Sequence, residues 1–189
     1  PTLEGLEAAH KLNIIHRDIK PANIFLTDGT MAGPRVRILD LGLAKDLVHD
    51  DELTSSDQMV GTPSYLAPEM FLGPQTRRWA PTADVFACGM LTFRMLAGGL
   101  PFDRSVANLT PIEQFLARAE FYQTVDEMPG PAQYVPSIPE PIDAVVRKAI
   151  CLTVGRRYQD AGEMLAELRR AMRGEEQRSS SAPNRQWRA

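Results

Sequence analysis

The sequence contains few cysteines, no excess of positive charge and no long apolar run. Its two cysteines, Cys88 and Cys151, lack the CxxC spacing of zinc sites. The longest apolar stretch, residues 85–93, is far shorter than the roughly 20 residues that span a bilayer. The net charge of −3 offers no basic field for a phosphate backbone. These absences argue against a disulfide framework, a membrane segment in this chain and nucleic acid as a partner. Both thiols are expected to lie buried in helices of a cytoplasmic protein.

The rest of the composition is that of an ordinary globular protein. Hydrophobic residues make up 43% and charged residues 24% of 189 residues, so the chain can bury one substantial core. We therefore expect one domain with appendages. The chain opens at Pro1 without an initiator Met or the pattern of a signal peptide, and we expect it to start partway into a longer protein.

Apolar spacing predicts a mainly helical chain with one small β-hairpin. Residues 3–12 repeat apolar side chains at helical spacing, and residues 84–96 are apolar on every face, as in a central buried helix. Further helices are predicted over 110–122, 142–152 and from 160 onward, where Asp160 and Glu163 resemble a capping box. Short β-type segments occur at 14–15, 23–26 and 36–39, and the last two predict the hairpin.

Two stretches lack this periodicity. Residues 42–74 are rich in Thr, Ser, Asp, Gly and Pro, which predicts a loop of about 30 residues, a length usually functional or disordered. After residue 173 the sequence has too little apolar surface to offset the entropy of ordering. We predict a disordered tail over 174–189.

One loop concentrates groups suited to phosphoryl transfer. Residues 16–23 read HRDIKPAN and lie just before a predicted strand. Asp18 could accept a proton from a hydroxyl, Lys20 could neutralise a developing phosphate charge, and Asn23 could offer an oxygen to Mg²⁺. At the end of the second hairpin strand Asp40 begins the triplet DLG, and its carboxylate could also hold Mg²⁺. Without the other residues, Asp18 could equally be an ordinary turn residue, and Asn23 could simply cap the loop.

The order of these motifs resembles the larger, C-terminal lobe of eukaryotic-like protein kinases. The matching segments are HRDIKPAN, DLG at 40–42, GTPSYLAPE at 61–69 and DVFACG at 84–89, followed by an arginine near the last helix. The helical end looks like that of bacterial-type serine/threonine kinases. The resemblance implies a kinase-like C-lobe fragment over 1–173, mainly α with a small β-hairpin and of the α+β class.

The resemblance assigns roles to individual residues. It implies that Asp18 orients the acceptor hydroxyl and takes its proton, and that Lys20 contacts the γ-phosphate of ATP. It implies Mg²⁺ ligation by Asn23 and Asp40, and bracing of the loop by Thr62. The lysine two positions after the catalytic aspartate implies transfer to Ser or Thr of protein substrates. The implied catalytic residues are Asp18 and Lys20, and the implied ATP-binding residues are Lys20, Asn23, Phe25 and Asp40.

Other matches are structural in the family. Glu69 and Arg157 match a buried ion pair, and Asp84 matches an aspartate that binds the backbone of the His-Arg-Asp turn. His16 and Leu41 match members of the family's packed spine. Phe25, Leu91 and Met95 match apolar positions of the family, and plain core packing is at least as good a reading of these three.

The loop from Asp40 to Glu69 becomes the activation segment under this resemblance. Thr54 and Ser56 lie at the spacing of autophosphorylated positions, and a phosphate there could pair with Arg17. The alternative is a merely polar loop tip.

The Gly-rich loop, the ATP-binding lysine and its helix glutamate have no counterpart in this sequence, so the N-terminal lobe is absent from it and is expected in the native protein. The predicted function is a partial serine/threonine kinase that uses ATP and Mg²⁺ in the cytoplasm, or at the cytoplasmic face of a membrane if the full chain continues. The alternative is a catalytically inactive kinase-like binding module; a third reading is a fragment that folds poorly. We expect little or no stabilisation of the 189-residue chain by ATP.

Overall fold

The computed structural model describes residues 1–27, 35–40, 63–71, 79–103 and 108–181. The predicted residues Leu41, Thr54, Ser56 and Thr62 lie outside these ranges. The helices and strands within the ranges are α1 (Thr2–Lys11), β1 (Ile24–Thr27), β2 (Arg35–Ile38), α2 (Pro81–Ala97), α4 (Pro111–Thr124), α5 (Glu140–Ala149) and α6 (Ala161–Ser181). Short 3₁₀ turns precede β1 (η1, Pro21–Asn23) and α2 (η2, Pro63–Tyr65; η3, Pro68–Met70), and two more flank α5 (η4, Pro131–Gln133; η5, Val154–Arg156).

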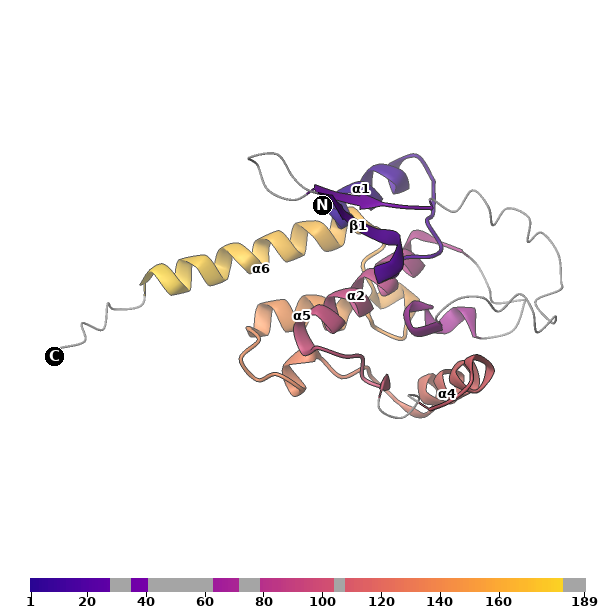
Figure 1. The fold of residues 1–189 in the computed structure, drawn as a ribbon. Coiled ribbons are helices and arrows are strands. Elements are labelled where there is room, and N and C mark those ends of the chain that lie inside the picture. Colours follow the sequence, from indigo (N-terminus) through magenta and orange to yellow (C-terminus); the bar gives the residue numbers. More distant parts are fainter. Residues whose placement is uncertain (28–34, 41–62, 72–78, 104–107, 182–189) are drawn as a thin grey trace.

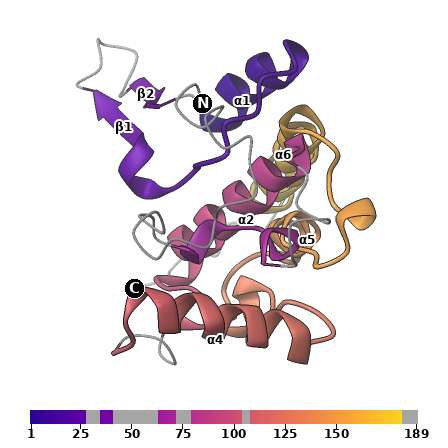
Figure 2. The same cartoon turned by 90° about the vertical axis from the view of Figure 1, so that its right-hand side faces the viewer.

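Helix α2 lies at the centre of the molecule. Helix α1 and the β-hairpin lie on one side of it, and α4 lies on the opposite side (Figures 1 and 2). Helices α5 and α6 pack against each other and against α2, while α1 packs against the first part of α6. The later part of α6 extends away from the other elements (Figure 1).

Helix α2 is central because apolar side chains occupy most of its faces, and its exposed residues, Arg94 and Met95, lie near its C-terminal end. Val85, Phe86, Met90 and Phe93 have no exposed surface. Gly89 allows close approach to α5, since a Cβ there would lie 2.6 Å from Ile150 Cγ2 and 2.8 Å from Ala149 Cβ. The helix ends at Gly98, whose φ of 76° lies in the left-handed region that glycine adopts without a Cβ clash.

The predicted helices and hairpin are confirmed with small shifts at their ends. Strands β1 and β2 pair antiparallel, with Ile24 opposite Ile38. Thr110 and Glu113 form a reciprocal capping box at the start of α4. Asp160 Oδ1 accepts from Glu163 N (2.9 Å) as predicted for α6, whereas the Glu163 carboxylate reaches Gln159 N.

Some expectations need correction. Residues 14–15 are irregular, not β-type, because the chain there leaves α1 through a helix-ending turn. Cys88 is buried in α2, and burial raises the pKa of its thiol, but Cys151 lies just beyond α5 and is half-buried. Met95, which matches an apolar position of the family, is 70% exposed.

Helix α6 also runs further than expected. It continues to Ser181, beyond the predicted start of the disordered tail at residue 174. Glu, Gln and Arg in this stretch favour helix even without apolar side chains to bury. Residues 182–189 lie outside the described part of the chain, and their disorder stays a prediction. Among the described residues, no helix combines the length and apolar content that a bilayer span requires.

Candidate active site

Asp18, Lys20 and Asn23 form one hydrogen-bonded cluster before β1. Lys20 Nζ lies 2.9 Å from Asp18 Oδ2, and Asn23 Nδ2 donates to the same oxygen at 3.1 Å and to the Asp18 carbonyl at 2.7 Å. Two donors therefore hold one carboxylate oxygen of Asp18. The structure thus brings together three of the predicted site residues.

The local sequence explains this geometry. Lys20 is extended, with φ −160° and ψ 164°, as expected for a residue before proline. Pro21 then begins the 3₁₀ turn η1, and the amide of Asn23 donates to the Lys20 carbonyl at 3.0 Å. This tight turn folds the Asn23 side chain back toward Asp18 while β1 starts at the next residue.

The hairpin brings Asp40 to the same edge. Leu39 N donates to the Asn23 carbonyl at 2.9 Å, which extends the β1–β2 ladder by one pair and places Asp40 one residue further along. Asp40 is exposed and has a φ of 56°, and Arg17 on the other loop has a φ of 69°. Each non-glycine residue in this region costs about 1–3 kcal/mol, so the site is bounded by two strained backbone positions.

Asp84 on α2 anchors the loop that carries Asp18. Its side chain is almost fully buried and accepts from the backbone amides of His16 (2.8 Å) and Arg17 (2.9 Å), as the resemblance implied. His10 Nε2 lies 3.0 Å from the same carboxylate. Because His10 Nδ1 accepts from Ala161 N at 3.2 Å, its proton sits on Nε2 and is donated to Asp84.

His16 connects this loop to the hairpin. Its Nδ1 accepts from Asp18 N at 3.3 Å, so its Nε2 carries the proton and donates to the Leu39 carbonyl at 2.9 Å. The ring is fully buried. His16 therefore ties the backbone before Asp40 to the backbone at Asp18.

The predicted ion pair behind the site is present. Arg157 Nη1 and Nη2 donate to Glu69 Oε1 (2.8 Å) and Oε2 (2.7 Å), and the Arg157 side chain has no exposed surface. Its guanidinium also lies 4.9 Å from the centre of the Phe86 ring. This bidentate pair fixes η3, near the end of the predicted long loop, against the turn before α6, and Arg157 also donates to the Thr82 carbonyl on α2.

The remaining predicted residues have more varied positions. Phe25 lies on β1 and is 55% exposed, so it is not a core residue. Leu91 is half-buried against the core. The Arg17 guanidinium lies 6.0 Å from the centre of the Trp79 ring.

Sequence reasoning missed two buried polar residues near these elements. His10 was assigned no role, although its spacing on α1 places it on the buried face. Arg118 is 1% exposed on α4, where its Nη2 donates to Ser64 Oγ at 2.7 Å. No local pattern signals a contact between residues so far apart in sequence.

The oxygen donors of the cluster fit a magnesium ion. The nitrogen of the Asn23 amide is used by Asp18, which leaves its oxygen as the side-chain atom suited to a cation. Asp40 adds an exposed carboxylate at the same edge. In the described part of the chain, no three His, Cys, Asp or Glu side chains gather into a metal site, so this pair depends on oxygens from a further group such as a phosphate.

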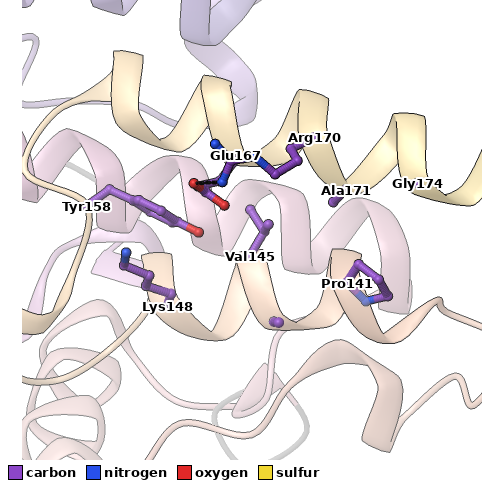
Figure 3. A pocket seen from close by; sticks show the side chains of 9 residues that line it. Pro141, Val145, Lys148, Tyr158, Glu167, Arg170, Ala171 and Gly174 are labelled. Carbon is purple, nitrogen blue, oxygen red and sulfur yellow. Dashed lines mark hydrogen bonds and ion pairs between the residues drawn. The ribbon is translucent and has the colours of Figure 1, made fainter.

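Two cavities among the described residues lie away from this cluster. A groove of about 440 Å³ runs between α5 and α6, lined by apolar surface and by paired charges (Figure 3). Lys148 Nζ lies 4.3 Å from the centre of the Tyr158 ring, and Glu167 forms an ion pair with Arg170. A second cavity, of about 390 Å³, lies beside His10 where α1 meets the starts of α2 and α6. Neither includes a predicted catalytic residue.

Comparison with known proteins agrees with this arrangement. The family model "Protein kinase domain" matches residues 1–167, and the chain belongs to the protein kinase family. Enzymes of this family generally use ATP and Mg²⁺.

The curated relatives are named as serine/threonine kinases. The "Probable serine/threonine-protein kinase PknB" of Corynebacterium glutamicum is 35% identical over 181 residues, covering 92% of this chain and 25% of that protein. "Serine/threonine-protein kinase Pkn1" of Myxococcus xanthus is 33% identical over 155 residues, covering 82% of this chain and 21% of that protein. The chain thus shares the protein kinase family with proteins that are named serine/threonine kinases. It spans about a quarter of the length of these relatives.

Proposed function

We propose that this chain forms the C-terminal lobe of a serine/threonine kinase domain, over residues 1–173, and transfers the γ-phosphate of ATP to Ser or Thr hydroxyls of proteins. The observation that carries the proposal is the cluster of Asp18, Lys20 and Asn23, in which two donors orient one carboxylate. In the proposed native protein, a Gly-rich loop, a lysine and a helix glutamate from an N-terminal lobe complete the ATP site.

In this proposal each residue acts on a stated atom. The Asp18 carboxylate accepts the proton of the acceptor hydroxyl. At the same time the hydroxyl oxygen forms a bond to the γ-phosphorus, and the bond between the γ-phosphorus and the β-phosphate oxygen breaks. Lys20, held by Asp18, neutralises charge on the γ-phosphate oxygens. Asn23 and Asp40 hold Mg²⁺, which neutralises the phosphate charges when bound. Phe25 forms part of the adenine floor.

Control of the site is proposed for the long loop. Thr62 braces Asp18 and Lys20, and phosphate on Thr54 or Ser56 pairs with Arg17 to order the segment. Phosphopeptide mapping of an active preparation tests the second point, and the absence of phosphate on both residues contradicts it. We place the reaction in the cytoplasm, or at the cytoplasmic face of a membrane in a longer protein, because both cysteines are free thiols and ATP is the phosphoryl donor.

The decisive experiment is Asp18→Asn in the native polypeptide that carries this sequence. Loss of a general base removes about 10²–10⁴-fold of rate, so transfer of labelled γ-phosphate to protein acceptors should fall by that factor. Asp126→Asn, at an exposed position beyond α4, is the matched control and should transfer normally. Transfer unchanged by Asp18→Asn contradicts the proposal.

A thermal melt separates the catalytic proposal from the binding-module alternative. The native polypeptide should be stabilised by ATP and Mg²⁺ in a saturable way, because a ligand that binds the folded state raises its stability. The 189-residue chain alone should show little or no shift. No shift in the native polypeptide favours the module.

A further inference from the structure

The groove between α5 and α6 is bounded at one end by a side-chain contact and is open at the other. At the first end the Lys148 ammonium lies over the Tyr158 ring, 4.3 Å from its centre. Pro141 and Gly174 lie at the opposite end (Figure 3). Beyond the adjoining backbone of its own helix, a Cβ on Gly174 would meet nothing within 4 Å among the described residues. A side chain can therefore enter the groove from the Gly174 end.

The lining between the two ends suits an apolar side chain. It includes Ala144 and Val145 from α5 and Ala171 from α6. Arg170, at the edge, forms an ion pair with Glu167. A cavity of about 440 Å³ with apolar walls takes up apolar groups, because they remove its surface from water. The groove therefore fits one large apolar side chain better than an ion.

Gly174 is unusual for its place in α6. The helix continues beyond it to Ser181, and glycine in a helix interior is less favourable than alanine because it loses more backbone freedom. Glycine is the residue that leaves room for close approach of another group. In the described part of the chain no neighbour uses the room over Gly174. This favours an occupant from outside the described residues.

The sequence that follows α6 supplies an occupant. Residues 182–189 read APNRQWRA, and Trp187 is the only aromatic residue after Tyr158. Pro183 cannot continue an α-helix, and proline followed by asparagine favours a turn. A polar segment with one large apolar side chain therefore begins where the chain can change direction.

This segment is long enough to reach the groove. Gly174 lies seven residues before Ser181, or about 10 Å along the helix at 1.5 Å per residue. The six residues from Ser181 to Trp187 extend up to about 20 Å at 3.3 Å per residue. A chain that turns back along α6 therefore brings Trp187 to Gly174 with about 10 Å to spare. The lining positions from Gly174 back to Arg170 cover only about 6 Å of helix.

The charge at the open end also matches this segment. Arg185 and Arg188 give the segment two positive charges, and it contains no acid. Glu140, next to Pro141 at the start of α5, has a side chain that is 77% exposed and contacts Arg147 at 3.3 Å. Its carboxylate has room for a second cation. An exposed pair of this kind contributes little to affinity but favours one orientation of the bound segment.

We propose that Trp187 docks in the open end of the groove between α5 and α6, so that residues 182–189 fold back along α6. The indole fills the space over Gly174 and Ala171, and a basic side chain of the segment lies beside Glu140. The docked segment then sets the direction in which the polypeptide leaves this domain. The inference holds whether or not the chain transfers phosphate.

The test is fluorine NMR of the native polypeptide labelled with 5-fluorotryptophan. The resonance that disappears in Trp187→Phe belongs to Trp187, and a labelled peptide of residues 182–189 gives the value for free indole. Because the signal averages over populations, a mostly docked Trp187 should show less than about half the broadening of the peptide in a soluble nitroxide. Broadening equal to that of the peptide overturns the inference.

Two arginine substitutions on α6 locate the docking site. Gly174→Arg fills the open end while the helix is retained, because arginine has the higher helix propensity and its Cβ meets no described neighbour. This variant should return Trp187 to the value of the free peptide. Met172→Arg, at a position that is 53% exposed, is the matched control and should leave Trp187 protected. Full protection in Gly174→Arg shows that the indole lies elsewhere and overturns the inference.

Dilution separates docking within one chain from docking between two chains. Protection of Trp187 that stays constant on dilution supports the inference. Protection that is lost on dilution assigns the groove to Trp187 of a second copy and overturns it.

Thermal melts of the native polypeptide give an independent check. Trp187→Ser should lower the melting temperature of this domain by about 2–4 °C, and in the Gly174→Arg background it should have no further effect, because the two positions act through one contact. Equal losses in both backgrounds, or no loss in either, contradict docking at Gly174.

Discussion

Asp84 illustrates how one buried residue determines the geometry of the site. Its carboxylate accepts hydrogen bonds from two backbone amides of the Asp18 loop and from the Nε2–H group of His10. A carboxylate with three donors tolerates burial, because charge-assisted hydrogen bonds replace its hydration. The position of Asp18 is therefore determined from the core of the molecule.

Asp84→Asn should be strongly destabilising. The amide offers a single acceptor oxygen and directs an NH₂ group at a backbone donor, so at least one buried N–H loses its partner. We expect a loss of about 2–3 kcal/mol in the free energy of unfolding, measured by urea denaturation. The exposed Asp126→Asn variant should lose little. A stability equal to wild type shows that Asp84 is not the anchor.

Tyr122→Phe should be neutral or stabilising. The Tyr122 hydroxyl is buried with no hydrogen-bond partner among the described residues, and its ring packs against Phe71, Phe86 and Phe121. Removing the hydroxyl keeps these ring contacts and removes an unsatisfied polar group, which we expect to raise stability by up to about 1 kcal/mol. Tyr122→Leu, which loses the ring contacts, should be destabilising. A loss of stability in Tyr122→Phe identifies a partner for the hydroxyl.

At the scale of elements, α1 shows how a helix end sets the loop that follows. Ile14 N donates to the Ala9 carbonyl and Asn13 N to the His10 carbonyl, with Asn13 at a φ of 58°. This is a Schellman ending with asparagine in the left-handed position. It turns the chain from α1 toward His16.

Asn13 variants test this ending. Asn13→Gly should keep or raise stability by up to about 1 kcal/mol, because glycine adopts positive φ freely. Asn13→Val should lower stability by about 1–2 kcal/mol, because a β-branched residue clashes in the left-handed conformation. Equal melting temperatures for the two variants contradict this account.

The elements were predictable from sequence to the extent that their signals are local. Apolar periodicity predicted α1, α2 and the other helices, and alternation with turn residues predicted the hairpin. The β-type reading of residues 14–15 was wrong, because two isoleucines after a helix give the same local signal whether or not a strand partner exists.

Contacts between distant residues were predictable only by resemblance. The pairs Asp84 with His16 and Glu69 with Arg157 join residues 68 and 88 positions apart, and no spacing rule reveals them. His10 and Arg118 showed no motif at all, since their roles come from the packing of helices that are remote in sequence. Asp18, Lys20 and Asn23 were found together because one short turn carries all three.

At the scale of the whole molecule, alkaline pH should lower stability. Burial raises the pKa of Tyr65, Tyr122 and Tyr158, in the case of Tyr158 to about 12. The unfolded chain releases its phenolic protons near pH 10, so above that pH the folded state binds more protons and the free energy of unfolding falls. Below about pH 9 these groups contribute no pH dependence.

Urea midpoints measured from pH 8 to 11.5 test this expectation. Tyr158→Phe should reduce the decline above pH 10, and Tyr134→Phe, at a half-exposed position, is the matched control. A midpoint that stays constant to pH 11.5, or a decline that Tyr158→Phe leaves unchanged, contradicts it.

The packing of α1 against α6 has a consequence for synthesis of the protein. His10 accepts a hydrogen bond from Ala161 N, and Glu4 forms an ion pair with Arg169. The residues of α6 that contact α1 are therefore translated only about 150 residues after it. At 5–20 residues per second, a ribosome needs roughly 8–30 s to translate that interval. During that time the apolar face of α1, including Leu3 and Leu6, has no α6 to cover it, and the nascent chain is a natural client for a chaperone that binds short apolar helices.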